Sequence, residues 1–406
     1  MDIIVQKFGG TSVATEELRK KVASKVVATK ESGKNPIVVV SAIGRRGDKY
    51  ATDTLVNMAT SVYDGDNARD LDIIMSVGEI ISSVILSNTI KAMGYEAQAV
   101  TGFQAGIITD NHFGDADVLK VDNKYLMDLL NKGIIPVVAG FQGVTETGEI
   151  TTLGRGGSDT TAAILGEALQ AKCVEIYTDV DGVMTADPRV VTKARVIDEI
   201  DYEEIYQMAD EGAKVVHPRA VAVAKRSNIP MKVKNTLNES KGTIIIQKNH
   251  YLRKFRKSLE EDNVIRAIAH KNNISQVSVY FNDNMEDNDI LMNNLTKFQV
   301  SIDLINFFTD KKVFTIDNKD LDKVKNIMGK NKFEYSIIEN CSKVTAIGHK
   351  IRGIPGVMGK IVKALSHSGI KILQSSDSHT TISCLIKEEH IEKAVNALHA
   401  EFNLDK

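Results

Sequence analysis

The chain has 406 residues and a formal net charge of -2 at pH 7, from 51 lysine and arginine residues and 53 aspartate and glutamate residues. This length exceeds one ordinary domain and indicates two or three, each able to bury its own core. The nearly balanced charge argues against a global role on nucleic acid or on a membrane surface, so neither is expected as a partner.

The three cysteines are Cys173, Cys341 and Cys384, which are far apart and have no CxxC spacing. This usage indicates reduced thiols rather than a disulfide framework or a zinc site. The N-terminus has a strand pattern where a secretory signal would have a basic and then a long apolar segment, and no apolar run is long enough to span a bilayer. We therefore expect a cytoplasmic protein.

The first dozen residues predict a strand, a glycine turn and a helix in succession. The β-branched run at 3–5 is typical of a strand buried on both faces of a parallel sheet, and Gly9 and Gly10 follow where the chain must turn tightly. A helix is predicted over 15–33, with a threonine N-cap and a terminal glycine. The N–H groups of such a turn favour an anion, and Lys7 adds a positive charge. An ordinary turn beside a solvated lysine explains these residues equally well.

Strand and helix patterns alternate as far as residue 247, which indicates a mostly parallel sheet with helices on both faces. Further strands are expected at 36–42, 96–100, 134–139, 173–179, 230–235 and 242–247, and helices at 66–93, at 123–131, after 158 and at 202–210. The polar segment 44–53 is a predicted loop at a strand end, where open α/β sheets bind substrates. Glu79 lies among small and apolar neighbours, so it either reaches solvent from a helix face or is held inward to meet a cation.

A second glycine-rich helix start occupies residues 151–171. Three glycines surround Arg155, and Ser158 and Asp159 stand where the N-cap of the helix is expected. An arginine binds carboxylates in a bidentate way, and Asp159 could orient a lysine or phosphate oxygens bound to Mg²⁺. Capping explains one of these residues but not three glycines with an arginine among them.

Two further segments suggest a nucleotide site. The loop 180–189 follows a strand and contains Asp-Gly and Asp-Pro turns, and its polar residues could hold a nucleoside. The segment 212–219 is expected to break at Pro218, which leaves Lys214 near a helix end, within reach of a phosphate or of solvent; His217 is expected to be structural. The chain has no GxxxxGK[ST] motif and no GxGxxG after a strand, so a pocket for a polyphosphate and a small carboxylate must be built in another way.

Six segments, in this order and spacing, resemble the signature of the aspartate kinases. They are KFGGTSV at 7–13, VVVSA at 38–42, the Gly-Glu pair at 78–79, TTLGRGGSDTTAA at 151–163, TDVDGV with TADPR at 178–189, and GAKVVHP at 212–218. The resemblance implies an α/β amino-acid kinase fold over 1–248, with a mostly parallel sheet sandwiched by helices. It also implies Mg²⁺-dependent transfer of a phosphoryl group from ATP to the β-carboxylate of L-aspartate, the first step of lysine, threonine and methionine synthesis.

The resemblance also implies roles for individual residues. Lys7 and Asp159 are the expected catalytic residues. The expected ATP and phosphate contacts are Lys7, Phe8, Gly9, Gly10, Thr178, Asp179, Met184, Asp187, Arg189 and Lys214. The expected substrate contacts are Ser41, Thr52, Glu79, Arg155 and Ser158. No metal ion is expected to be held directly by protein ligands, and Met184 stands where the family usually has a tyrosine.

The composition changes after residue 248, where a charged segment at 249–262 is expected to be a linker. Beyond it, 263–340 and 341–406 resemble a tandem pair of ACT domains, the α+β, ferredoxin-like amino-acid sensors of aspartate kinases. The second unit lacks its last strand, so we expect the strand at 264–269 to complete the second sheet. The matching effector positions are Met285, Ser301, Ile302 and Asp303, for lysine, threonine or both. The resemblance also implies a homo-oligomer, a dimer or a dimer of dimers, formed through the ACT units.

Two alternatives remain open from the sequence. One is another amino-acid kinase such as N-acetylglutamate kinase, although the acylated amine of its substrate would leave Glu79 without a cation. The other is a non-catalytic amino-acid-binding regulator, which Lys7, Asp159 and Lys214 argue against.

Overall fold

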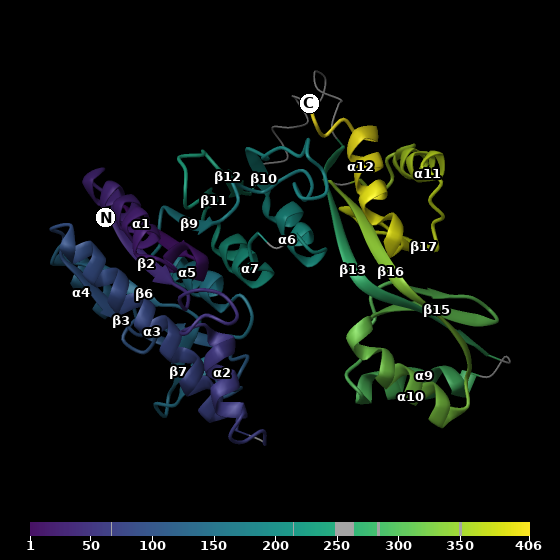
Figure 1. The fold of residues 1–406 in the computed structure, drawn as a ribbon, viewed down its shortest axis with the longest axis horizontal. Coiled ribbons are helices and arrows are strands. Elements are labelled where there is room, and N and C mark those ends of the chain that lie inside the picture. Colours follow the sequence, from purple (N-terminus) through teal and green to yellow (C-terminus); the bar gives the residue numbers. More distant parts are fainter. Residues whose placement is uncertain (66, 214, 248–263, 282–284, 349–350) are drawn as a thin grey trace. The chain divides into compact units, whose positions relative to one another are not determined.

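A computed structural model describes residues 1–65, 67–213, 215–247, 264–281, 285–348 and 351–406 (Figure 1). The predicted linker at 249–262 lies outside the described residues. The chain forms two compact units, and the division does not follow the sequence simply. The first unit contains 1–183, 196–209 and the described residues from 215 to 247, whereas 184–195 and 210–213 belong with the C-terminal residues in the second unit.

The first unit is organised around an eight-stranded sheet. In spatial order its strands are β10 (Glu199–Asp201), β12 (Thr243–Ile246), β11 (Met231–Asn235), β9 (Cys173–Thr178), β1 (Ile3–Phe8), β2 (Asn35–Val40), β6 (Ile135–Ala139) and β3 (Ala97–Val100). Neighbouring strands run parallel except β11 and β12. All seven strands predicted in this unit are present, and β10 is an additional edge strand.

Helices cover both faces of this sheet, as the sequence predicts. They are α1 (Glu16–Glu31), α2 (Thr52–Thr60), α3 (Ala68–Ala92), α4 (Lys124–Asn131), α5 (Gly157–Ala168), α6 (Tyr202–Asp210) and α7 (Pro218–Ser227). Strand β1 shows the two faces directly, because its successive side chains alternate. Gln6 donates a hydrogen bond to Thr29 of α1, whereas Lys7 on the opposite face meets Asp159 of α5. The central strands are almost wholly buried.

A second sheet in the same unit was not predicted. It consists of β5 (Val118–Val121), β4 (Ile107–Thr109), β7 (Gln142–Thr145) and β8 (Ile150–Thr152). Each of these strands has only three or four residues, and several of the residues are threonines. No long apolar run therefore marks the strands in the sequence. Helix α3 packs on β8, and this contact links the small sheet to the large one.

The structure corrects three local predictions. Helix α5 has Gly156 as its N-cap, in a left-handed conformation with φ 71°, so the expectation that Ser158 or Asp159 caps it is wrong. Both lie in its first turn instead. Pro218 does not end a helix but is the first residue of α7, a position that tolerates its missing N–H. The predicted loop at 44–53 gives way to α2 at Thr52.

Among the described residues, α3 is one helix with the length and hydropathy of a membrane-crossing segment. The sequence expectation that no apolar run reaches this length therefore does not hold for α3. Its buried positions include Asp72, Ser76 and Glu79, and it packs against α1, α2 and the strands β3, β6 and β8. These are the contacts of a core helix.

The second unit contains a six-stranded antiparallel sheet. Its order is β14 (Ile305–Phe307), β15 (Lys311–Asp317), β13 (Ile265–Tyr280), β16 (Glu334–Gly348), β18 (Thr381–Lys387) and β17 (Gln374–Asp377). The helices α9 (Met285–Lys297) and α10 (Leu321–Asn331) belong to the half of the sheet around β15, and α11 (Val357–His367) and α12 (Ile391–Glu401) to the half around β18.

Strands β13 and β16 each run through both halves of this sheet. The first part of β13, Ile265 to Lys271, pairs with the end of β16, and its side chains pack with α11 and α12. The second part, Ile274 to Tyr280, pairs with β15 and with the start of β16. The prediction that the two ACT units are interleaved, with the strand at 264–269 completing the second sheet, requires this arrangement.

Candidate active site

Lys7 and Asp159 are brought together from different elements. Lys7 is near the end of β1, and its Nζ lies 2.6 Å from Oδ1 of Asp159 in the first turn of α5. The Oδ2 atom of Asp159 accepts a hydrogen bond of 3.2 Å from the backbone N–H of His217. A carboxylate is stabilised at this position by the N-terminal end of the helix. The lysine is therefore held in one place while 14% of its side chain remains exposed.

The glycine turn after β1 packs closely on the loop after β2. A Cβ atom on Gly10 would lie 2.3 Å from the carbonyl oxygen of Ala42 and 2.8 Å from that of Gly44, closer than any side chain allows. The backbone N–H of Gly44 donates to Gly10 at 3.1 Å. Phe8, by contrast, stacks on Tyr177 in the core with ring centroids 4.6 Å apart. Only the backbone of Phe8 is thus available to a ligand.

Glu79 is held inward by the same loop. Only 3% of it is exposed, and its Oε1 accepts a hydrogen bond of 3.1 Å from the backbone N–H of Ala42. Its Oε2 is buried and has no hydrogen-bond partner among the described residues. Burial raises the pKa of Glu79 to about 8, against the smaller opposing effect of the Ala42 N–H. The inward position was one of two predicted from the sequence, and an unpartnered carboxylate oxygen there suits a cationic ligand group.

Glycines also allow the other substrate residues to approach. Gly140 lies against Ser158, whose Oγ would be 3.0 Å from a Cβ at that glycine. Arg155 is exposed between two glycines with positive φ, and no ion pair joins it to a described residue. Ser41, directly after β2, and Thr52, the first residue of α2, are both half-buried. The predicted substrate residues thus lie just after β2 and β8, at the starts of α2 and α5, and in the middle of α3.

The predicted nucleotide residues are divided between the two units. Thr178 ends β9, and the exposed Asp179 next to it forms a 3.0 Å ion pair with Arg45. Arg45 was missed, although two adjacent arginines in the polar loop were a signal. In the second unit, Arg189 forms a bidentate pair with Asp187, which holds the pKa of that carboxyl below its usual range. Of the other predicted nucleotide residues, Met184 is half-buried in the second unit, and Lys214 lies outside the described residues.

No group of three or more histidine, cysteine, aspartate or glutamate side chains in the described part of the chain could hold a metal ion. The three cysteines are buried and unpaired. His217 is the N-cap of α7, and its ring packs against Gly156, in agreement with the structural role expected for it.

Comparison with known proteins connects this geometry to a family. The sequence profile of the amino acid kinase family matches residues 2–235, and that of an ACT domain matches residues 336–400. Aspartokinase 1 of Bacillus subtilis is 40% identical over 411 residues, covering 100% of both chains. The aspartokinase of Geobacillus stearothermophilus is 38% identical and covers 100% of this chain and 98% of its own. The chain belongs to the aspartokinase family.

Solved structures agree with this assignment to the aspartokinases. The structure of Escherichia coli aspartokinase III with aspartate and ADP has a TM-score of 0.78 and 26% identity, covering 98% of this chain and 99% of its own. The same enzyme with lysine and aspartate has a TM-score of 0.75 at 26% identity. The predicted family, and an amino-acid kinase fold followed by ACT domains, are confirmed.

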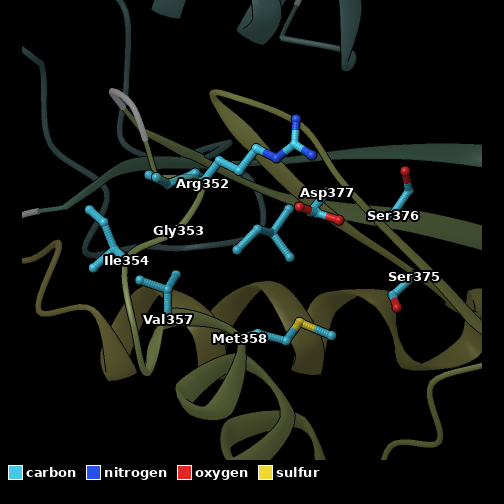
Figure 2. Close-up of a pocket in the computed structure, with 10 residues that line it drawn as sticks. Arg352, Gly353, Ile354, Val357, Met358, Ser375, Ser376 and Asp377 are labelled. Atoms are coloured by element: carbon cyan, nitrogen blue, oxygen red, sulfur yellow. The ribbon is translucent and has the colours of Figure 1, made fainter.

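A cavity of about 320 Å³ lies in the second half of the six-stranded sheet, at the start of α11 (Figure 2). Figure 2 shows Val357 and Met358 below it, and Arg352 and Asp377 above. The predicted effector positions are elsewhere. Of these, Ser301 is exposed, Ile302 is half-buried, Asp303 forms a 2.5 Å ion pair with Lys343, and the Met285 side chain is outside the described residues.

Proposed function

We propose that this member of the aspartokinases transfers a phosphoryl group from ATP to the β-carboxylate of L-aspartate, giving 4-phospho-L-aspartate and ADP. The observation that carries the choice of substrate is Glu79 on α3, a buried carboxyl group with one oxygen that has no partner among the described residues. An α-ammonium group would satisfy that oxygen. The relatives named above, and the E. coli enzyme solved in complex with aspartate and ADP, support the same reaction.

The reaction requires that the two substrates be positioned and that the charge on the transferred phosphoryl group be neutralised. A β-carboxylate is already ionised at neutral pH, so no general base is needed, and the developing charge on the phosphoryl group has to be stabilised. Lys7, oriented by Asp159, and the backbone of Gly9 and Gly10 would stabilise it. Mg²⁺ bound to the ATP phosphates would supply further neutralisation. Since no metal-binding group of side chains is found among the described residues, phosphate oxygens and water would be the main metal ligands.

The resemblance to the family implies the remaining contacts. Arg155 would bind the α-carboxylate and Glu79 the α-ammonium. Ser41, Thr52 and Ser158 would form hydrogen bonds with the substrate. Thr178, Asp179, Met184, Asp187, Arg189 and Lys214 would line the nucleotide site.

The test is ADP release from MgATP with aspartate, with N-acetylglutamate or with neither, using hydroxylamine to trap an acyl phosphate. Trapped product that depends on aspartate supports the proposal. Product with N-acetylglutamate alone would favour the other amino-acid kinase, whose substrate has no α-ammonium for Glu79. No turnover with either acid would favour a non-catalytic regulator.

We further propose that lysine, threonine or both inhibit the enzyme through the ACT region. The cavity near α11 has the chemistry of a zwitterion site, because Arg352 can meet a carboxylate and Asp377 an ammonium. The positions Met285, Ser301, Ile302 and Asp303 stay a second prediction. Ser301→Ala and Asp377→Asn separate the two locations: the variant that loses inhibition by millimolar lysine or threonine identifies the site. Inhibition that persists in both variants would contradict both locations.

The same family membership supports a cytoplasmic homo-oligomer, a dimer or a dimer of dimers, joined through the ACT units. Light scattering coupled to size-exclusion chromatography, with and without lysine, measures the mass. A monomer under both conditions would contradict this part of the proposal.

A further inference from the structure

Asp72 is a buried carboxylate that the reaction outlined above does not use. It lies on α3 and is 0% exposed. Its Oδ2 accepts hydrogen bonds from the backbone N–H groups of Gly114, at 3.0 Å, and Thr152, at 2.8 Å. Its Oδ1 accepts a third, of 2.7 Å, from the hydroxyl of Thr152. A buried carboxylate is costly unless it is fully hydrogen-bonded, and here three donors from two other segments converge on it.

The two segments that Asp72 holds lead directly to the turn that carries Arg155. Thr152 is the last residue of β8, three positions before Arg155. Asp115, next to Gly114, lies so close to Gly154 that a Cβ on that glycine would be 2.2 Å from its Oδ1. Asp72 therefore holds both the strand that leads into this turn and the segment that packs against it.

A second contact closes the same corner of the unit. Arg219 of α7 forms a 2.6 Å ion pair with Asp115 and donates a 2.8 Å hydrogen bond to the carbonyl oxygen of Leu153. The turn thus rests on polar contacts from two helices, and the buried Asp72 supplies the part that comes from α3.

The same helix carries Glu79 two turns further on. Seven residues of α-helix advance about 10.5 Å and bring the side chain back to nearly the same face. Asp72 and Glu79 both lie on the buried side of α3. The part of α3 between Asp72 and Glu79 is consequently a rigid spacer. Asp72 is bonded to Thr152, just before the turn of Arg155, and Glu79 is bonded to Ala42 in the loop after β2.

We propose that Asp72 is a positioning residue that sets the spacing between Arg155 and Glu79, and thereby the affinity for an α-amino acid substrate. The inference rests on the proposed function, in which these two side chains bind the α-carboxylate and the α-ammonium. Both groups sit on one carbon atom of the substrate, so the receptors must be placed within a fraction of an ångström. A contact that only stabilises the fold would not change the affinity for the substrate.

Steady-state kinetics of four variants test the proposal. Asp72→Asn removes part of the acceptor capacity and should raise KM for aspartate about tenfold or more, with KM for MgATP within about twofold. Thr152→Val removes only the hydroxyl bond and should raise KM for aspartate a few-fold. Thr152→Ser keeps the hydroxyl and should restore the wild-type value. Thr109→Val is the matched control. It breaks a buried 2.6 Å hydrogen bond between the hydroxyl groups of Thr109 and Thr151, and Thr151 lies beside Thr152 on β8 but does not contact Asp72 through this bond.

The outcomes distinguish a failure of the positioning role of Asp72 from a failure of the proposed function. A fall in melting temperature with an unchanged KM for aspartate in both Asp72→Asn and Thr152→Val would overturn the positioning role, and so would an equal rise in KM in Thr109→Val. If Asp72→Asn does not fold, the comparison of Thr152→Val with Thr152→Ser decides. Wild-type protein that forms no aspartate-dependent acyl phosphate would instead overturn the proposed function, and this inference with it.

Discussion

The two ionisable side chains at the centre of the site are held in opposite ways. Lys7 is neutralised by Asp159 before any ligand arrives, whereas Glu79 is buried with an unpartnered oxygen. The lysine is therefore already oriented for a charge that develops during the reaction. Burial favours the protonated form of the glutamate, and a cationic ligand group beside it would favour the ionised form.

Replacing Lys7 with alanine should lower kcat about 10²–10³-fold, with smaller changes in both KM values, because a preorganised electrostatic contact would be lost. Lys25→Ala is a suitable control. Lys25 is also largely buried and ion-paired, but on the other face of the sheet, with Glu239. Near-normal turnover of Lys7→Ala would contradict the role given to this lysine.

The raised pKa of Glu79 predicts a pH dependence of stability. Between the ordinary value of 4.5 and about 8, the folded state keeps a proton on this group that the unfolded state has lost. Stability should therefore fall as pH rises through this window, by an amount on the order of a few kcal/mol. Denaturant unfolding of wild type and Glu79→Gln at pH 5 to 8 measures the effect, since the glutamine variant lacks this slope. Parallel curves for the two proteins would argue against a raised pKa.

The same pKa predicts how aspartate binding varies with pH. The ionised form of Glu79 is the one that attracts an ammonium group, so KM for aspartate should fall as pH rises from 6 toward about 8. In Glu79→Gln the KM should be higher and nearly independent of pH over this range. Initial rates at several aspartate concentrations and saturating MgATP provide the measurement.

At the scale of single elements, the site depends on the close approach of two loops and a helix. Gly10 lies against the loop after β2, and Gly78 on α3 lies against the same loop, 2.7 Å from the Ala42 Cβ if it carried a Cβ of its own. Side chains at either glycine would separate β1, β2 and α3 at their shared corner. The glycine turn thus has a packing role in addition to the phosphate binding that we propose for it.

Gly10→Ala should displace the loop at 42–44 and lower kcat/KM for aspartate at least tenfold, with a loss of about 1–3 kcal/mol in stability from overpacking. Gly329→Ala provides the contrast. Gly329 lies in α10, and a Cβ added there would meet no neighbouring atom within 4 Å, so alanine should stabilise by about 0.5–1 kcal/mol. Gly10→Ala with wild-type kinetics would show that the loop contact is dispensable.

The sequence predicts the large sheet well because β1, β2 and β6 contain runs of β-branched residues and glycines follow each of them. The small sheet escapes prediction because its strands are as short as loops and owe their pairing to α3 and to one another. The N-cap of α5 was misassigned because Gly156 adopts a left-handed conformation and packs against the His217 ring, a contact between residues far apart in the sequence. Likewise, hydrophobic periodicity alone does not show that Glu79 points inward, since this depends on the loop that packs over it.

At the scale of the whole molecule, short segments of the kinase sequence belong with the regulatory sheet. Glu211, directly after α6, forms a 2.8 Å ion pair with Lys343 of β16, which also pairs with Asp303. Burial acts to lower the pKa of Lys343, but the two carboxylates outweigh it and hold the pKa above its usual value. A linear division of the chain at residue 248 therefore cuts across these contacts.

Replacing Lys343 with methionine should destabilise the second unit by about 3 kcal/mol, because Glu211 would be left buried without its partner. The double variant Lys343→Met/Glu211→Gln should recover part of the loss. Calorimetric unfolding of the full chain measures both effects. Lys325→Met, which breaks the more exposed pair with Glu339, should change the stability by no more than about 0.5 kcal/mol. Equal losses for the two lysine variants would contradict the special importance of burial here.

The two long strands of the regulatory sheet have a consequence for synthesis. Ile265 leaves the ribosome more than eighty residues before Gly348, the residue opposite it, and β18 is completed only near the end of the chain. The apolar start of β13 must consequently wait without its partner while the rest is translated. We expect ribosome-bound chains that stop after β15 to be cleaved readily by protease within 265–271, and chains that extend past α12 to be resistant there. In this protein the regulatory region becomes stable last.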